Sequence, residues 1–178
     1  PHIAAHNGAA EELGEWIAGL IVPHERAFCL LTVQHYISEG FSLVGRVDVP
    51  CVVDFTRLAW VDVTGDGDEE LLLRTIPPYE RSYKSGASLQ RLYIYTVDDE
   101  LVELATLDGE LNGSDGEGIR WRDVDGDDSV EILAGLPLLD IEDRGFPDTR
   151  ARRFEIYEWD AAGREFVSTG FWEAGVVD

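Results

Sequence analysis

The stretch that decides the fold reads LAWVDVTGDGDEELLLRT and runs from Leu58 to Thr75. It consists of a short aromatic and β-branched run, an acidic turn with glycine, and an apolar run. Runs of this kind, separated by Gly and Asp, are typical of two strands joined by a loop. A second stretch of the same design, IRWRDVDGDDSVEILAG, runs from Ile119 to Gly135. The spacing of the two stretches indicates an internal repeat of about 60 residues.

A strand-like hairpin follows each of these stretches, and another hairpin precedes the first of them. Each repeat then holds four strands, which is the signature of propeller blades. We therefore predict a mainly β chain of antiparallel, four-stranded, propeller-like blades. Because its strands are too few for an ordinary closed propeller, we expect a partial or open one. The predicted parts of this single domain, 1–178, are a leading hairpin at 26–50 and blade-like repeats at 58–108 and 119–171.

Only the N-terminal segment favours a helix. Asn7 can cap such a helix, and apolar residues between Leu13 and Leu20 recur at three- and four-residue spacing. Pro23 would end it, because proline interrupts helical hydrogen bonding. The sequence therefore predicts one helix at 7–22.

The two acidic loops carry oxygen-bearing side chains at equivalent places. Counted from Asp62 and from Asp123, these side chains stand at positions one, three, five and nine. Calcium takes roughly six to eight oxygen ligands, and alternate residues around a tight turn can converge on one ion. Glycines allow the sharp backbone, and Asp128, a residue type that tolerates positive φ, stands where the first loop has Gly67. Without a cation, the clustered carboxylates would repel one another.

An EF-hand begins with a similar pattern, but it requires a glutamate at position twelve and a helix on each side. Position twelve is Leu73 in the first loop and Ala134 in the second. The flanking residues are also strand-like, so the EF-hand is excluded.

The loops and their flanks instead resemble the FG-GAP or VCBS repeats of integrin-like propellers and secreted bacterial proteins. The resemblance rests on the pattern D-x-D/N-x-D-G-x-x-D-L and covers roughly Leu58 to Gly170, which is most of the chain. Thr64 and the two glutamates at position nine depart from the commoner Asp or Asn. The resemblance implies two calcium sites, each with a backbone carbonyl ligand at position seven. The implied ligands are Asp62, Thr64, Asp66, the Asp68 carbonyl and Glu70, then Asp123, Asp125, Asp127, the Ser129 carbonyl and Glu131.

Charge and composition narrow the range of partners. The 36 acidic and 14 basic residues give a formal net charge of −22, which argues against nucleic acid and against an anionic membrane. No apolar run is long enough to insert into a membrane. The chain starts at Pro1 and lacks Met, so we interpret it as a processed or truncated product whose signal peptide has been removed. We therefore expect an extracellular, cell-surface or periplasmic location, where Cys29 and Cys51 either form a disulfide or remain two buried thiols.

These features predict a calcium-binding module for protein interaction, adhesion or surface assembly that is not an enzyme. The alternatives are a carbohydrate-active hydrolase domain and a carbohydrate-binding module. Trp60 and Trp121 each stand two residues before a loop aspartate, and we interpret them as core between blades and not as a sugar platform. The exposed ends of an open stack favour a protein partner or self-association. The residues expected to contact a partner lie in one loop: Tyr79, Arg81, Tyr83 and Lys84.

Overall fold

The computed structural model describes residues 2–7, 15–21, 28–37, 40–51, 56–78, 88–111, 118–136 and 152–174. These residues form three antiparallel sheets of four strands each, and they contain no helix, membrane-spanning or other. The first sheet holds β1 (His2–Asn7), β2 (Glu15–Ile21), β3 (Phe28–Ile37) and β4 (Gly40–Pro50). The middle sheet holds β5 (Arg57–Val61), β6 (Glu70–Thr75), β7 (Leu89–Val97) and β8 (Leu101–Glu110). The third sheet holds β9 (Ile119–Arg122), β10 (Glu131–Gly135), β11 (Arg152–Asp160) and β12 (Glu165–Ala174).

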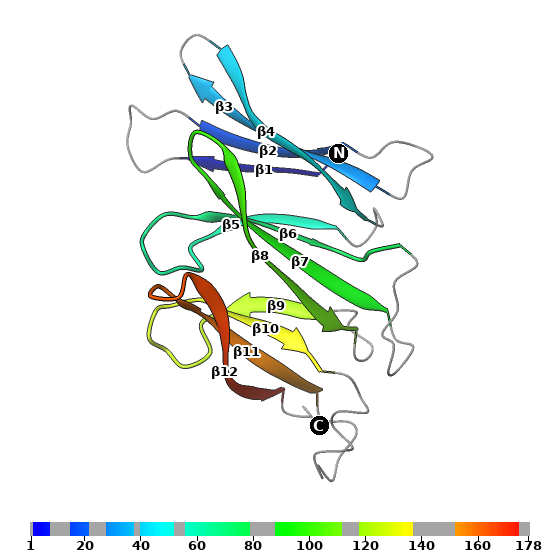
Figure 1. The fold of residues 1–178 in the computed structure, drawn as a ribbon, viewed down its shortest axis with the longest axis vertical. Helices are drawn as coiled ribbons and strands as arrows, with labels where there is room; N and C mark the ends of the chain where they lie inside the picture. The colour runs from blue at the N-terminus through cyan, green and yellow to red at the C-terminus, as the bar shows by residue number, and fades with distance from the viewer. Residues whose placement is uncertain are drawn as a thin grey trace.

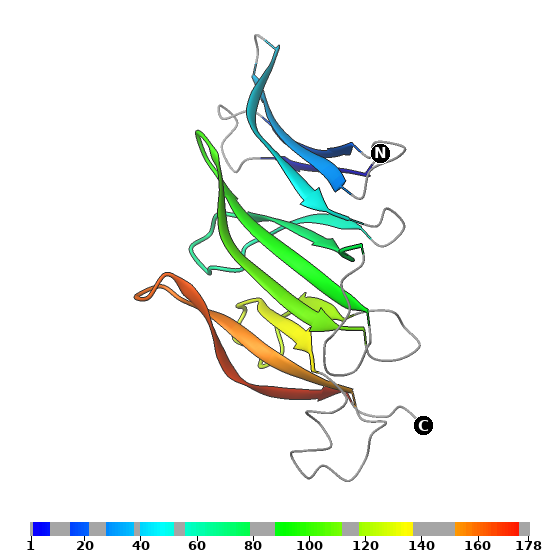
Figure 2. The same cartoon turned by 45° about the vertical axis from the view of Figure 1, so that its right-hand side comes forward.

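Strands that follow one another along the chain pair within each sheet, and the sheets stack in chain order (Figure 1). The first and third sheets lie at opposite ends of the stack, so the described sheets do not close into a ring (Figure 2). The mainly β, antiparallel, four-stranded architecture is thus confirmed. The assignment to a propeller stays a prediction.

The predicted helix at 7–22 is wrong in the part that the structure describes, because Asn7 ends β1 and Glu15–Ile21 forms β2. In β2 the side chains alternate: Ala18 and Leu20 are buried, whereas Ile21 is exposed. A short apolar run satisfies the period of a helix and the period of a strand about equally well. Pairing with β1 on one side and β3 on the other decides for the strand.

The leading hairpin at 26–50 is present as β3 and β4. It is half of a complete sheet, however, because β1 and β2 extend it to four strands. The two later repeats, predicted at 58–108 and 119–171, correspond to β5–β8 and β9–β12 with bounds that differ by a few residues. The described residues therefore form three four-stranded units and not two.

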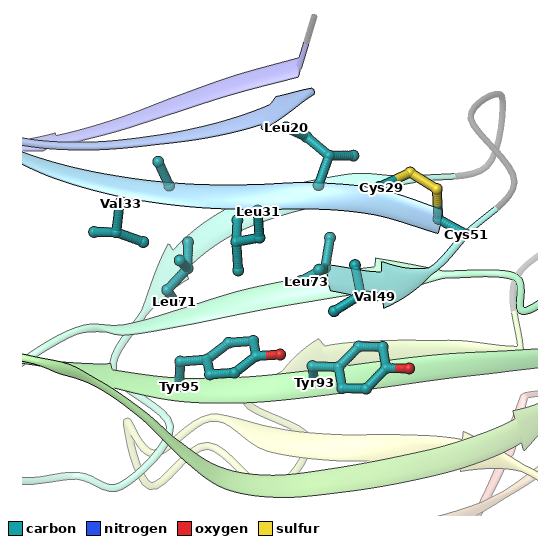
Figure 3. Close-up of a cluster of buried hydrophobic side chains, with 11 residues drawn as sticks. Leu20, Cys29, Leu31, Val33, Val49, Cys51, Leu71, Leu73, Tyr93 and Tyr95 are labelled. Carbon is teal, nitrogen blue, oxygen red and sulfur yellow. A yellow bond between two sulfur atoms is a disulfide. The ribbon is translucent and has the colours of Figure 1, made fainter. Parts of the chain in front are cut away.

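Two apolar cores lie between the sheets, one at each interface. Leu71 and Leu73 face the first sheet, where Leu31 and Val33 meet them (Figure 3). Leu72, which points the other way, packs between the middle and third sheets. All three leucines of β6 are fully buried, and burying each one stabilises the fold by about 1.5–3 kcal/mol. The middle sheet is covered on both faces, which explains why three consecutive leucines stand in β6 without a polar residue between them.

The repeated tryptophans occupy these cores. Trp60 packs against the core between the first and middle sheets, and Trp121 packs against the core between the middle and third sheets. The interpretation of both as core residues is confirmed.

Cys29 and Cys51 form a disulfide, with 5.7 Å between their Cα atoms. Cys29 lies in β3 and Cys51 follows β4, so the bond joins the two ends of the first sheet's hairpin (Figure 3). Both cysteines belong to the buried core beside the middle sheet. Between the two alternatives left by the sequence, the structure selects the disulfide.

Candidate metal centre

The loop between β5 and β6 is organised by its first aspartate. The Asp62 carboxylate accepts hydrogen bonds from the amides of Gly65, at 2.7 Å, and Gly67, at 2.9 Å. Asp66 accepts one from the Asp68 amide, at 2.9 Å. Gly65 and Gly67 have φ of 73° and 96°, a left-handed conformation that glycine adopts without steric cost. The turn therefore draws the carboxylates of positions one and five toward its centre.

The loop between β9 and β10 repeats this network. Asp123 accepts hydrogen bonds from the amides of Gly126, at 2.6 Å, and Asp128, at 3.2 Å. Asp127 accepts one from the Ser129 amide, at 2.8 Å. Asp128 has a φ of 71°, as expected from its alignment with a glycine of the first loop. The two loops thus share three hydrogen bonds at equivalent positions. In the second loop Asp125 also accepts a hydrogen bond from the Asp127 amide, at 3.2 Å.

Position nine is a buried glutamate in both loops. Glu70 begins β6 and Glu131 begins β10, and their exposed fractions are 4% and 3%. Each accepts a hydrogen bond from the backbone amide of position two, which is Val63 at 3.0 Å or Val124 at 2.7 Å. The adjacent strand thus holds a carboxylate beneath each turn.

The pKa of Glu70 is raised to about 7, chiefly by burial and also by the carboxylates of Asp66 and Asp62, against the lowering effect of the Val63 amide. Burial also raises the pKa of Glu131, with Asp125 and Asp127 acting in the same direction. The charged form of each glutamate is therefore disfavoured in the cation-free protein. A bound cation would stabilise that charged form.

In the second loop the carboxylates converge on one point. Oxygen atoms of Asp123, Asp125, Asp127 and Glu131 all lie within 4.8 Å of one another. Calcium binds oxygens at about 2.3–2.6 Å, so two ligands on opposite sides of the ion stand about 5 Å apart. The donor set and its spacing therefore fit one calcium ion, held by positions one, three, five and nine of this loop.

The first loop is less complete. Its position three is Thr64, whose hydroxyl donates a hydrogen bond to Glu70 at 3.3 Å. Within the part of the chain that the structure describes, a convergence of acidic ligands as close as that of the second loop is found nowhere else. The first loop offers fewer charges and one neutral oxygen, so we expect it to bind a cation more weakly.

The two loops lie on the same side of the stack (Figure 1), and both line one cavity of about 100 Å³. Thr64 lines it from the first loop and Asp127 from the second. Glu158 and Trp159 of β11 complete the wall, and the sequence patterns did not single out these two residues as part of a site. The residues of the predicted contact loop, Tyr79, Arg81, Tyr83 and Lys84, lie outside the described residues.

The raised pKa of Glu70 predicts how the calcium-free protein responds to pH. A carboxyl whose folded pKa is above its unfolded value stabilises the fold fully below about pH 4.5, and this contribution is lost as the pH rises through about 7. The free energy of unfolding, measured with urea on calcium-depleted protein, should therefore fall between pH 5 and pH 7.5. Glu70→Gln should flatten this dependence, whereas Glu69→Gln, at an exposed neighbour, should preserve it. If the free energy of unfolding of Glu70→Gln fell with pH as steeply as that of wild type, Glu70 would not be the group that causes the pH dependence.

Comparison with models of protein families, with curated proteins and with solved structures finds no match for this chain.

Proposed function

We propose that this chain is a non-catalytic calcium-binding module of the FG-GAP or VCBS type that acts outside the cytoplasm in protein interaction, adhesion or surface assembly. One observation carries the proposal: four carboxylates converge within 4.8 Å at the β9–β10 loop. The same hydrogen-bond network recurs at the β5–β6 loop, which supports a second site there.

Calcium in these loops would act on structure. Each loop joins the first two strands of a sheet, and each buried glutamate connects the turn to the strand beneath it. An ion that binds the folded loops stabilises them by mass action. It also offsets part of the repulsion among the clustered carboxylates. The role proposed for the metal is therefore to hold the hairpin loops in the shape that a partner meets.

The disulfide supports the proposed location. Disulfides persist mainly in oxidising compartments such as the periplasm and the extracellular space. The Cys29–Cys51 bond closes the first sheet's hairpin and is buried in the core. Free calcium is also plentiful outside cells, so weak sites of the kind found in extracellular modules would be filled there.

Calorimetric titration with calcium tests the proposal. Wild type is expected to bind two ions, one more tightly than the other. Asp127→Ala should abolish the tighter site because it removes a ligand from the complete cluster, whereas Asp66→Ala should abolish the weaker one. Asp99→Ala, in the exposed β7–β8 turn, removes the same charge without touching either loop and should bind as wild type does. If wild type shows no binding at millimolar calcium, the proposal fails.

A further inference from the structure

The two acidic loops are neighbours in the stack and form walls of one cavity. They lie on the same side of consecutive sheets (Figures 1 and 2). Each loop contributes several residues to this cavity of about 100 Å³. A change in the shape of one loop therefore alters a cavity that the other loop also lines. The residues are Val63, Thr64 and Gly65 from the first loop, then Asp127, Ser129, Val130 and Glu131 from the second.

In the first loop, both carboxylate oxygens of Glu70 bind residues of the cavity wall. The Oε2 atom accepts a hydrogen bond from the Val63 amide at 3.0 Å, and the Oε1 atom accepts one from the Thr64 hydroxyl at 3.3 Å. Glu70 and Thr64 are also two of the ligands expected for the first ion. The geometry that this ion meets therefore depends on where the cavity wall lies.

Two valines connect the cavity wall to one core. Val63 of the first loop is buried in the core between the middle and third sheets, and Val130 of the second loop packs against the same core. Val130 directly precedes Glu131, the buried ligand that begins β10. Close-packed interiors transmit the displacement of one side chain to its neighbours. An ion that fixes Glu131 therefore restrains Val130, and through the core it also restrains Val63.

The charges of the loops allow both sites to fill. Each loop holds five acidic side chains, so a loop that has bound one divalent ion keeps three negative charges. Such a loop still attracts a cation to its neighbour. Most of these carboxylates are exposed, and salt screens interactions between exposed charges beyond about 8 Å. The carboxylates thus offset the repulsion between two bound ions, and the restraint of the shared wall decides the sign of the coupling.

We infer that the two calcium sites are coupled, so that an ion in the second loop raises the calcium affinity of the first. The second loop, with four converging carboxylates, fills first. Because its ion restrains the shared wall, the first loop loses less conformational freedom when it binds in turn. Coupling between two sites typically changes an affinity by about 5–150-fold. Both loops then reach their bound shape over a narrower range of calcium concentration than independent loops would.

This inference rests on the calcium-binding function proposed above, and calorimetric titration of the 178-residue chain tests it. Asp127→Ala, which disables the second loop, should weaken calcium binding by the first loop by about five-fold or more. Asp128→Gly is the matched control. It removes the same charge from the same loop, keeps the four converging carboxylates, and places a glycine at a φ of 71°. The affinity of the first loop should then stay within about two-fold of wild type.

Amide hydrogen exchange measures the restraint itself. In Asp66→Ala, whose first loop lacks a ligand, calcium bound to the second loop should still slow exchange of the Val63 amide by about five-fold or more. The Leu111 amide is the control. It donates a hydrogen bond of 3.0 Å to the Ser88 carbonyl oxygen, at the end of the middle sheet opposite to the first loop. Its exchange should change by less than about two-fold, because amides at strand ends exchange by local fraying.

A double-mutant cycle tests the path through the core. In a Val63→Ala background, Asp127→Ala should weaken the first loop by less than about two-fold, because the truncated side chain transmits less of the restraint. Val61→Ala removes the same methyl groups from β5 against the same core, and the full effect of Asp127→Ala should persist there. Circular dichroism confirms that the valine variants are folded.

Several outcomes overturn the coupling and leave the calcium proposal standing. One is a wild-type chain that binds a single ion. Another is a first loop whose affinity is the same in Asp127→Ala as in wild type. Equal weakening by Asp127→Ala and Asp128→Gly would show that the lost charge, and not the lost ion, causes the effect. A wild-type chain that binds no calcium would instead refute the proposed function, and the coupling with it.

Discussion

Gly135→Val should lower the free energy of unfolding by about 3 kcal/mol or more. Gly135 ends β10, where the backbones of the middle and third sheets lie in close contact. A Cβ at this position would stand 2.4 Å from the Glu110 carbonyl oxygen and 3.1 Å from that of Gly118. Both are backbone atoms, so no side chain can rotate away to relieve the contact.

Gly135 belongs to a group of glycines with the same constraint. A Cβ at Gly109, in β8, would stand 2.4 Å from the Gly118 carbonyl oxygen. The Gly135 amide donates a hydrogen bond of 2.7 Å to that oxygen. The side-chain amide oxygen of the buried Gln90 accepts a hydrogen bond of 2.9 Å from the Gly118 amide. These contacts set the distance between the two sheets. A valine at Gly135 must either separate the sheets or break the hydrogen bonds.

Urea unfolding of dilute protein measures this effect. Gly170→Val is the matched control, because it makes the same substitution in the same sheet where a Cβ has room. Its free energy of unfolding should stay within about 0.5 kcal/mol of wild type. A Gly135→Val variant as stable as this control would show that the sheets do not depend on the close contact.

The sequence predicted the middle and third sheets well because the ends of their strands are marked by residues close by in the sequence. The aspartate loop, the two apolar runs around it and the hairpin behind it each obey short-range rules of turn chemistry and periodicity. The first sheet lacks this signal. Residues 8–14, between β1 and β2, read GAAEELG and contain no aspartate, and the sequence of this unit favours a helix followed by a hairpin. Strand pairing, which depends on distant residues, decided its structure.

The candidate site was predictable to the same extent. Its ligand positions follow from spacing within each loop, and the structure brings four of them together in the second loop. Other properties of the site depend on tertiary packing. The burial of Glu70 that raises its pKa, and the placement of Glu158 and Trp159 beside both loops, arise where separate strands meet. The spacing of residues along the chain does not predict such contacts between separate strands.

The cavity that both loops line also implies that the structure of each loop is coupled to the packing of the middle sheet on the third sheet. Val63 of the first loop is buried in the core between the middle and third sheets, and Val130 of the second loop packs against the same core. A loop that loses its ion and loosens would therefore disturb an interface between sheets as well as a turn. Calcium should then affect the cooperative unfolding of the chain, and its effect should be visible in a thermal melt.

Calcium at about 100 times each dissociation constant should raise the melting temperature by about 10–20 °C relative to the calcium-depleted protein. Each filled site adds about 2.7 kcal/mol at that concentration, and a chain of this size gains about 2–4 °C per kcal/mol. Asp127→Ala should lose about half of the shift because it removes a ligand from the complete cluster. Differential scanning calorimetry with and without chelator measures the effect, and Asp99→Ala, in the exposed β7–β8 turn, should keep the full shift. Identical melts of wild type in both conditions would show that no cation holds these loops.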